Sequence, residues 1–174
     1  MYDLNEQKIL EVIFKHPTTK FHLLELARQT KLHPNTVITA LKQLEKKSLI
    51  KQEKKKYLKE IYGNKENPNF NIEKKIFNLN QVYESGILDF IIKKFNPESV
   101  SIMGSYSRGE DIEDSDIDIV VISKEKYFNT DFQKFEKIMN RKIHLIVTNY
   151  KEISEEFYIN FINGIVLYGA INKK

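Results

Sequence analysis

The stretch most able to do chemistry is GSYSRGEDIEDSDIDIV, residues 104–120, in which acidic residues lead into a hydrophobic segment. Residues two apart in a strand point to the same face, so Asp116 and Asp118 are expected side by side, with the intervening isoleucine turned into a core. Two neighbouring carboxylates repel each other unless they share a proton or a cation. A hard divalent ion such as Mg²⁺ or Mn²⁺ suits oxygen ligands and leaves positions for substrate phosphates. The plainer interpretation is a solvated pair with Arg108 as counter-ion.

A glycine and a serine precede this pair, with ten residues between Ser105 and Asp116. Glycine lets the backbone approach a phosphate closely, and the serine hydroxyl and the following N–H groups can donate hydrogen bonds to it. Arg108 adds a positive fork in the same turn. We therefore predict that Gly104, Ser105 and Arg108 bind a phosphate group, and that Asp116 and Asp118 bind the metal.

This order of residues resembles the minimal nucleotidyltransferases of the superfamily that includes DNA polymerase β. The fuller stretch GSYSRGEDIEDSDIDIVVI follows that family's pattern GSxxRGxxxxxSDIDhhh, where h is hydrophobic. The resemblance covers about residues 86–169. It implies that Gly104, Ser105 and Arg108 bind a nucleotide, with ATP the expected donor. It also implies that Asp116 and Asp118 hold divalent ions that bridge the triphosphate. It also implies that a hydroxyl attacks the α-phosphorus and that pyrophosphate leaves.

The sequence departs from the family at one position. The family usually offers a third carboxylate on the next long strand, where this chain has His144. Imidazole is a poor ligand for Mg²⁺, so two interpretations stay open. His144 could be the base that joins Asp116 and Asp118 in catalysis, since imidazole titrates near neutral pH. Alternatively the site binds nucleotide with little or no turnover. Glu110 and Asp111 could substitute for the missing carboxylate or be ordinary surface charges.

Hydrophobic periodicity predicts the elements that position these residues. The first part should form three helices and a strand–turn–strand hairpin, over residues 5–15, 22–30, from Pro34 to about 46, and 49–62. A loop-like stretch, GNKENPNFN, covers residues 63–71. A connecting helix and a second helix to about Phe95 follow, with a break at Ser85-Gly86. The remainder alternates strands and helices, with strands at 99–103, 116–122, 141–149 and 164–169 and helices at 128–140 and 152–163.

This order predicts an α/β (α+β) chain with two domains. Residues 1–62 are similar to a winged helix-turn-helix, residues 63–85 are a linker and connecting helix, and residues 86–174 form the nucleotidyltransferase domain, with a mixed sheet covered by helices. The winged-helix resemblance implies that the helix from Pro34 enters the DNA major groove, with the hairpin beside it.

Residues 1–80 carry 16 basic residues against 9 acidic, a net charge of +7, while residues 81–174 carry 12 against 15, a net charge of −3. We expect the basic half to bind double-stranded DNA, with phosphate contacts supplying most of the affinity. The predicted DNA-binding residues are Asn35, Thr36, Thr39, Lys42, Gln43, Lys46, Lys54, Lys55 and Lys56. Residue by residue, such lysines are equally typical of a solvated face. We interpret Tyr57 and Tyr62 as domain-interface packing.

Composition narrows the class of protein. The chain has no cysteine, no apolar run of the roughly 18 residues that span a bilayer, and a polar start, MYDLNEQK, unlike a signal peptide. We therefore expect a cytoplasmic protein with no membrane partner.

Three functions remain open. The first is an autoregulating, antitoxin-like DNA-binding protein that transfers a nucleotide to a partner, because minimal nucleotidyltransferases are often encoded with HEPN-type toxins. The second is a transcription regulator with a degenerate, nucleotide-sensing domain. The third is a small-molecule or tRNA-end nucleotidyltransferase, ranked last because no substrate-binding domain of the usual size follows. We expect a homodimer, since winged helices that bind operators are commonly dimeric.

Overall fold

The structure is a computed structural model, and it describes residues 2–124 and 130–172. The chain divides into two compact units, residues 1–77 (unit 1) and residues 78–174 (unit 2). Helix α4, Pro68–Ser85, contains the point of division. Residues 68–71, which we expected in a loop, begin this helix, because Pro68 takes its first position, where proline's missing N–H costs nothing.

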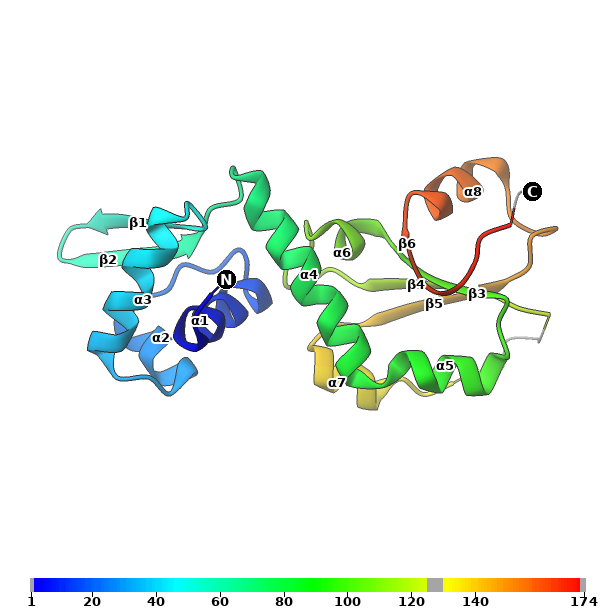
Figure 1. The fold of residues 1–174 in the computed structure, drawn as a ribbon, viewed down its shortest axis with the longest axis horizontal. Coiled ribbons are helices and arrows are strands. Elements are labelled where there is room, and N and C mark those ends of the chain that lie inside the picture. Colours follow the sequence, from blue (N-terminus) through cyan, green and yellow to red (C-terminus); the bar gives the residue numbers. More distant parts are fainter. Residues whose placement is uncertain (1, 125–129, 173–174) are drawn as a thin grey trace. The chain divides into compact units, whose positions relative to one another are not determined.

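Unit 1 contains three helices followed by a hairpin (Figure 1). The helices are α1 Leu4–Lys15, α2 Leu23–Thr30 and α3 Pro34–Lys46, and the strands are β1 Ile50–Lys55 and β2 Leu58–Gly63. Asp3 and Glu6 form a capping box that begins α1, and the His33 side chain accepts a hydrogen bond from the first turn of α3. The core joins all three helices to the strands, and its fully buried members include Ile9, Leu26 and Val37.

The hairpin has a two-residue turn, because Lys55 pairs with Leu58 across it. Lys56 occupies the left-handed region at φ 55°. Tyr57 is 98% exposed, so it has no packing role within unit 1. Tyr62 donates its hydroxyl hydrogen to Glu53 on the neighbouring strand, with Lys20 over its ring.

Unit 2 is built on a four-stranded sheet in the order β5-β4-β3-β6. The strands are β3 Ser99–Met103, β4 Ile117–Ile122, β5 Ile143–Thr148 and β6 Ile165–Gly169. Strand β3 is antiparallel to β4 and β6, whereas β4 and β5 run parallel. The helices are α5 Ile87–Phe95, α6 Gly104–Arg108, α7 Gln133–Met139 and α8 Glu155–Ile162. The mixed α/β fold expected from the sequence is confirmed.

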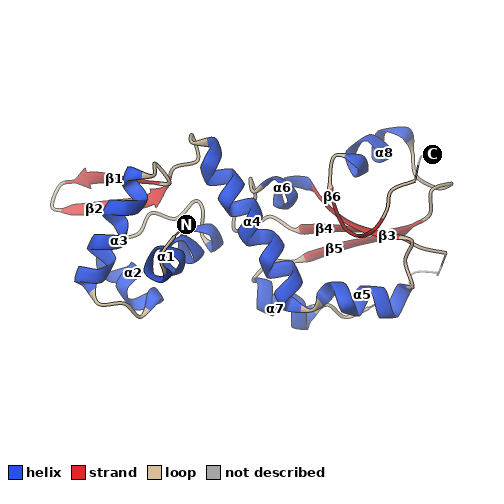
Figure 2. Cartoon of the chain, viewed as in Figure 1, coloured by secondary structure: helices blue, strands red, loops and turns tan. Residues whose placement is uncertain are grey.

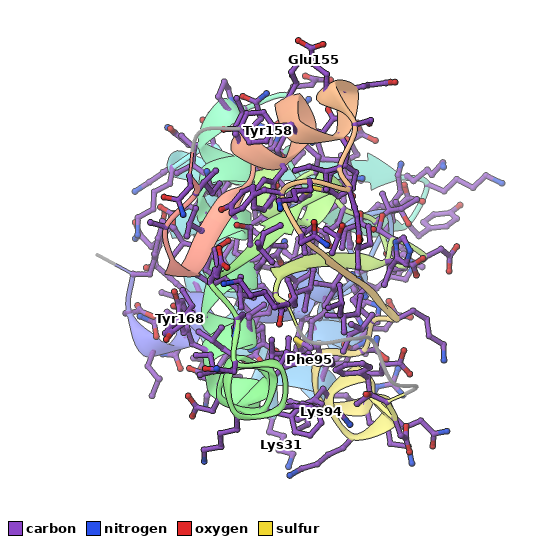
Figure 3. The ribbon with its side chains drawn as sticks, turned by 90° about the vertical axis from the view of Figure 1, so that its right-hand side faces the viewer. Lys31, Lys94, Phe95, Glu155, Tyr158 and Tyr168 are labelled. Atoms are coloured by element: carbon purple, nitrogen blue, oxygen red, sulfur yellow. The ribbon has the colours of Figure 1, made fainter. Side chains whose placement is uncertain are left out.

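Helices cover both faces of this sheet (Figure 2). Ile117, Ile119 and Val121 of β4 pack with α5 and α7, while Val120 and Ile122 pack on the opposite face with α8. Figure 3 shows Phe95 at the end of α5 beneath the sheet and Glu155 at the start of α8 pointing away from it. Asp118 shares the alternation of Val120, so it belongs to the α8 face.

One helix boundary in unit 2 agrees with the prediction and one differs from it. Helix α5 begins after Gly86, whose φ of 76° breaks the path from α4 at the expected position. Helix α7 begins at Gln133 and ends at Met139, inside the predicted range, of which residues 128–129 lie outside the described residues. Within the part of the chain that the structure describes, no helix combines the length and apolarity that a bilayer crossing needs.

Candidate active site

The glycine-serine turn lies directly against the predicted metal-binding strand. Strand β3 ends at Met103, which pairs with Asp118 of β4, and α6 begins at the next residue. Gly104 has φ 70°, and a Cβ added there would lie 2.5 Å from Oδ2 of Asp118. The left-handed backbone conformation therefore favours glycine at this position, and a larger residue would displace the Asp118 carboxylate. The turn is a close fit around one carboxylate oxygen.

The two aspartates lie where β4 begins. Ile117 and Ile119 are fully buried, as the alternation predicted, so the strand is anchored in the core. Asp116 is exposed, just before the first residue of the strand, and the Asp118 side chain is about one-third exposed. Both carboxylates can therefore meet a ligand from solvent while the strand that carries them is held rigidly.

His144 contacts this site from the neighbouring strand. It pairs with Asp118 in the parallel register of β4 and β5, and its Nδ1 lies 2.9 Å from Oδ1 of Asp118. The ionised carboxylate can only accept, so Nδ1–H donates, and Nε2 is then the nitrogen able to accept a proton. The position of the family's third carboxylate is thus held by an imidazole that is hydrogen-bonded to the second one.

Arg108 lies at the end of α6 rather than inside the turn. Its Nε donates to Oε2 of Glu110 at 2.7 Å, and both side chains are about half exposed. An exposed pair of this kind contributes about 0–1 kcal/mol, so an incoming phosphate could replace the glutamate. The structure thus assigns Glu110 a local counter-ion role instead of the metal-ligand role considered from sequence.

Asp111 is buried and holds the acidic loop in place. Its Oδ1 accepts a 2.7 Å hydrogen bond from the Asn78 side chain, and its Oδ2 lies 3.5 Å from the Arg141 guanidinium. Asn78 also donates to the backbone carbonyl of Tyr106, and burial together with the Asp111 charge raises the pKa of that tyrosine. Asp111 is therefore a structural residue, and its interpretation as a substitute ligand or a surface charge is wrong.

A surface pocket of about 530 Å³ opens beside Asp116. It lies between residues 113–116, helix α7 and residues 140–142. Local sequence patterns did not predict this pocket. Residues 113–116 and residues 133–142 are about twenty residues apart in the sequence and come together only in the folded structure.

The oxygen donors fit a divalent ion that arrives with a nucleotide. No group of three His, Cys, Asp or Glu side chains within the described ranges is arranged to hold a metal. Asp116 and Asp118 offer carboxylate oxygens, the ligands Mg²⁺ prefers, and His144 adds a nitrogen that it does not prefer. Two protein carboxylates leave most positions of an octahedral ion for phosphate oxygens and water. The residues present thus suit an ion shared with a triphosphate.

The predicted DNA-binding residues gather on two exposed surfaces of unit 1. Asn35, Thr39, Lys42, Gln43 and Lys46 are exposed at helical three- and four-residue spacing on α3, and Thr36 is half-buried. Lys54, Lys55 and Lys56 are exposed at the hairpin end.

Several lysines near these surfaces are already paired. Lys47 contacts Glu6, Lys51 contacts Glu66, and Lys55 lies 3.4 Å from Glu60. Among the described residues, Lys54 and Lys56 have no ion-pair partner, so these two carry the uncompensated charge of the tip.

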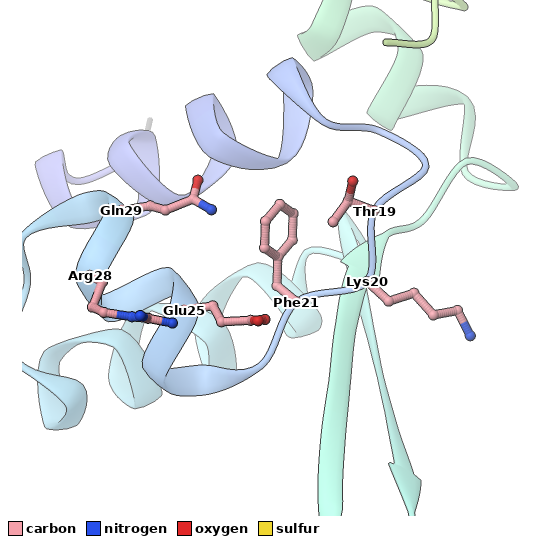
Figure 4. Close-up of a pocket in the computed structure, with 6 residues that line it drawn as sticks. All are labelled: Thr19, Lys20, Phe21, Glu25, Arg28 and Gln29. Carbon is pink, nitrogen blue, oxygen red and sulfur yellow. The ribbon is translucent and has the colours of Figure 1, made fainter.

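Unit 1 also has a pocket of about 490 Å³, lined by the residues drawn in Figure 4. Two of its charged residues, Glu25 and Lys20, have structural roles. Glu25 accepts from the backbone N–H of His22 and so caps α2, and Lys20 donates to Glu60 at 2.9 Å. That hydrogen bond raises the pKa of Lys20 and lowers the pKa of Glu60. We assign this pocket no ligand.

Comparisons with known proteins agree with this geometry. The nucleotidyltransferase domain family matches residues 84–168. A protein of Methanocaldococcus jannaschii, which carries the name putative protein adenylyltransferase, is 42% identical over 64 residues, covering 33% of this chain and 71% of the relative. No solved structure matches the chain. The Gly104 turn, the Asp116–Asp118 pair and the mixed sheet lie within the matched region, and the chain belongs to the nucleotidyltransferase domain family, with a polymerase β-like fold.

Proposed function

We propose that unit 2 transfers a nucleotide from a nucleoside triphosphate, with ATP the expected donor, to a hydroxyl group on a protein. The observation that carries this proposal is the close fit of the Gly104 turn around Asp118, beside a second exposed carboxylate. The family match supports nucleotide transfer, and the name of the archaeal relative supports adenylyl transfer to a protein.

In the reaction, the acceptor oxygen forms a bond to the α-phosphorus, the bond to the β-phosphate oxygen breaks, and pyrophosphate leaves. Gly104 and Ser105 would present backbone N–H groups, and Ser105 its hydroxyl, to the phosphates. Arg108 would exchange its exposed contact with Glu110 for a phosphate. Asp116 and Asp118 would hold Mg²⁺ or Mn²⁺, which when bound neutralises charge on the triphosphate.

His144 is the candidate general base. Because its Nδ1–H donates to Asp118, the ring is oriented and the tautomer with an unprotonated Nε2 is favoured. Such a nitrogen can accept the proton of an attacking hydroxyl. The competing function is nucleotide sensing without transfer, which the missing third carboxylate favours.

For unit 1 we propose binding to double-stranded DNA as a homodimer, with α3 in the major groove and the hairpin on the backbone. Three helices, a hairpin and the exposed basic surfaces support this. Joined to nucleotide transfer, DNA binding supports an autoregulating, antitoxin-like protein whose acceptor would be a HEPN-type toxin. The small-molecule or tRNA-end transferase stays the last alternative.

Labelled nucleotide separates these functions. The purified chain is incubated with α-labelled ATP, Mg²⁺ and an extract of the source organism, alongside an Asp116→Asn/Asp118→Asn variant. Labelled protein that requires both aspartates supports transfer. Saturable ATP binding without any label in protein supports sensing instead. Absence of both binding and label refutes the proposed function.

A further inference from the structure

The hairpin tip presents a tyrosine with no packing role. Tyr57 is the most exposed of the large apolar and aromatic side chains in the described part of the chain, and Leu58 beside it is 59% exposed. Lys56, which precedes it, has φ 55°, a conformation that costs a non-glycine residue about 1–2 kcal/mol. Two-residue hairpin turns usually place glycine or asparagine in that conformation. The tip thus combines backbone strain with an exposed phenol.

Most other described tyrosines have engaged hydroxyls. Tyr2 donates to Glu73, Tyr62 to Glu53, Tyr106 to a buried carbonyl, and Tyr150 and Tyr158 to carbonyls near the chain end. Burial and Glu73 raise the pKa of Tyr2 to about 12, and the hydrogen bond to Glu53 raises the pKa of Tyr62, so both phenols are harder to deprotonate.

Tyr83 and Tyr168 are about half exposed, but they lie within α4 and β6. A side chain within a helix or a strand can approach another surface only together with the element that carries it. Tyr57 instead lies at the end of two paired six-residue strands, which extend about 20 Å at roughly 3.3 Å per residue. Figure 1 shows this hairpin projecting beyond the three helices of unit 1.

We infer that Tyr57 is an acceptor for the nucleotide transfer, so that this chain modifies its own hairpin. This inference rests on the function proposed above and names one substrate for it. Oη of Tyr57 would bond to the α-phosphorus of the nucleoside triphosphate, and the bond to the β-phosphate oxygen would break. Pyrophosphate leaves with that electron pair, and the phenolic proton passes to Nε2 of His144.

The charges of the two partners are complementary. Lys54, Lys55, Lys56 and Lys59 surround Tyr57 in the sequence, and all four are exposed. On the site, Asp114 and Asp116 are exposed beside the 530 Å³ pocket, whose lining also includes Glu113, Glu136, Lys137, Arg141 and Lys142. Arg141 pairs with Asp111 and Lys142 with Glu136, so the lining keeps an excess of acidic groups. Opposite charges of this kind steer association and fix its register. A basic tip that carries a phenol therefore suits the acidic rim of the site.

Labelling of the purified chain tests the inference. Wild-type protein is incubated with α-labelled ATP and Mg²⁺, and the site of modification is mapped by peptide mass spectrometry. Tyr57→Phe should lose nearly all of the self-labelling, and Asp116→Asn/Asp118→Asn should lose all of it. Tyr83→Phe, a matched change at an exposed tyrosine within a helix, should label like the wild type. Labelling of extract proteins by the Tyr57→Phe chain should be unchanged.

Self-labelling that persists in Tyr57→Phe, or that maps to another residue, overturns the inference. So does a wild-type chain that labels extract proteins and never itself, an outcome that leaves the proposed function in place. A chain that labels neither itself nor any extract protein refutes both. If the Tyr57→Phe chain no longer labels extract proteins, Tyr57 contributes to catalysis and is not simply the residue that receives the nucleotide. That result would also overturn the inference.

Discussion

Replacing Gly104 with alanine should separate the nucleotide site from the stability of the fold. The added Cβ would lie 2.5 Å from Oδ2 of Asp118, which is 0.9 Å inside the 3.4 Å at which ordinary contact begins. Displacing a reacting group by about 1 Å can cost on the order of 10²-fold in rate. The left-handed backbone adds about 1 kcal/mol of destabilisation. We expect Gly104→Ala to lower nucleotide transfer about 100-fold, measured with α-labelled ATP.

Gly86→Ala is the matched control. Gly86 has φ 76°, close to that of Gly104, but nothing lies within 4 Å of its added Cβ. Both variants should therefore lose about 1 kcal/mol of unfolding free energy, or roughly 4–8 °C in Tm for a domain of this size. Only Gly104→Ala should lose transfer. Equal activity in the two variants would refute the argument that this glycine fits around a catalytic carboxylate.

Three further predictions test the rest of the molecule. His144→Asn keeps a side-chain donor for Asp118 but removes the base, so the rate of nucleotide transfer should fall about 10²–10⁴-fold. The affinity for ATP, measured by equilibrium dialysis, should stay the same. An unchanged transfer rate would exclude His144 as the base. Lys54→Glu/Lys56→Glu should weaken duplex DNA binding and flatten its salt dependence in a fluorescence titration, since these lysines lack ion-pair partners among the described residues. The control variant Lys93→Glu/Lys94→Glu on α5 makes the same charge change in unit 2. An equal loss of DNA affinity in the two variants would show that the hairpin is not part of the DNA-binding surface. Glu60→Gln should make stability less dependent on acid pH, because Lys20 lowers the pKa of Glu60 below its ordinary 4.5. A depressed carboxyl pKa contributes stability above pH 4.5, and this stability is lost as the pH falls below that value. The unfolding free energies of the two proteins, measured in urea, should therefore converge at low pH. A difference between them that stays constant with pH would contradict the pairing.

Much of the chain was predictable because the relevant signals are local. Pro34 and the apolar periodicity placed the helices of unit 1 within a few residues of their observed ends. The spacing from Gly104 to Asp118 located the turn and the strand that carries the two aspartates, and Gly86 marked the break between α4 and α5. These features depend on the backbone angle φ, on the alternation of side chains in a strand and on helical spacing. Each of these is determined by residues close together in the sequence.

Other features depend on segments that meet only in the folded sheet. Parallel pairing of β4 and β5 brings His144 to Asp118. Packing joins Asp111 to Asn78 and to Arg141, which lie thirty or more residues away on either side of it in the sequence. The sequence alone determined that this chain has a glycine turn followed by two carboxylates, because all residues of that motif lie in one continuous segment, residues 104–118. Only the tertiary structure decided which charged groups are buried, paired or exposed, because the partner of a charge is chosen by packing between distant segments.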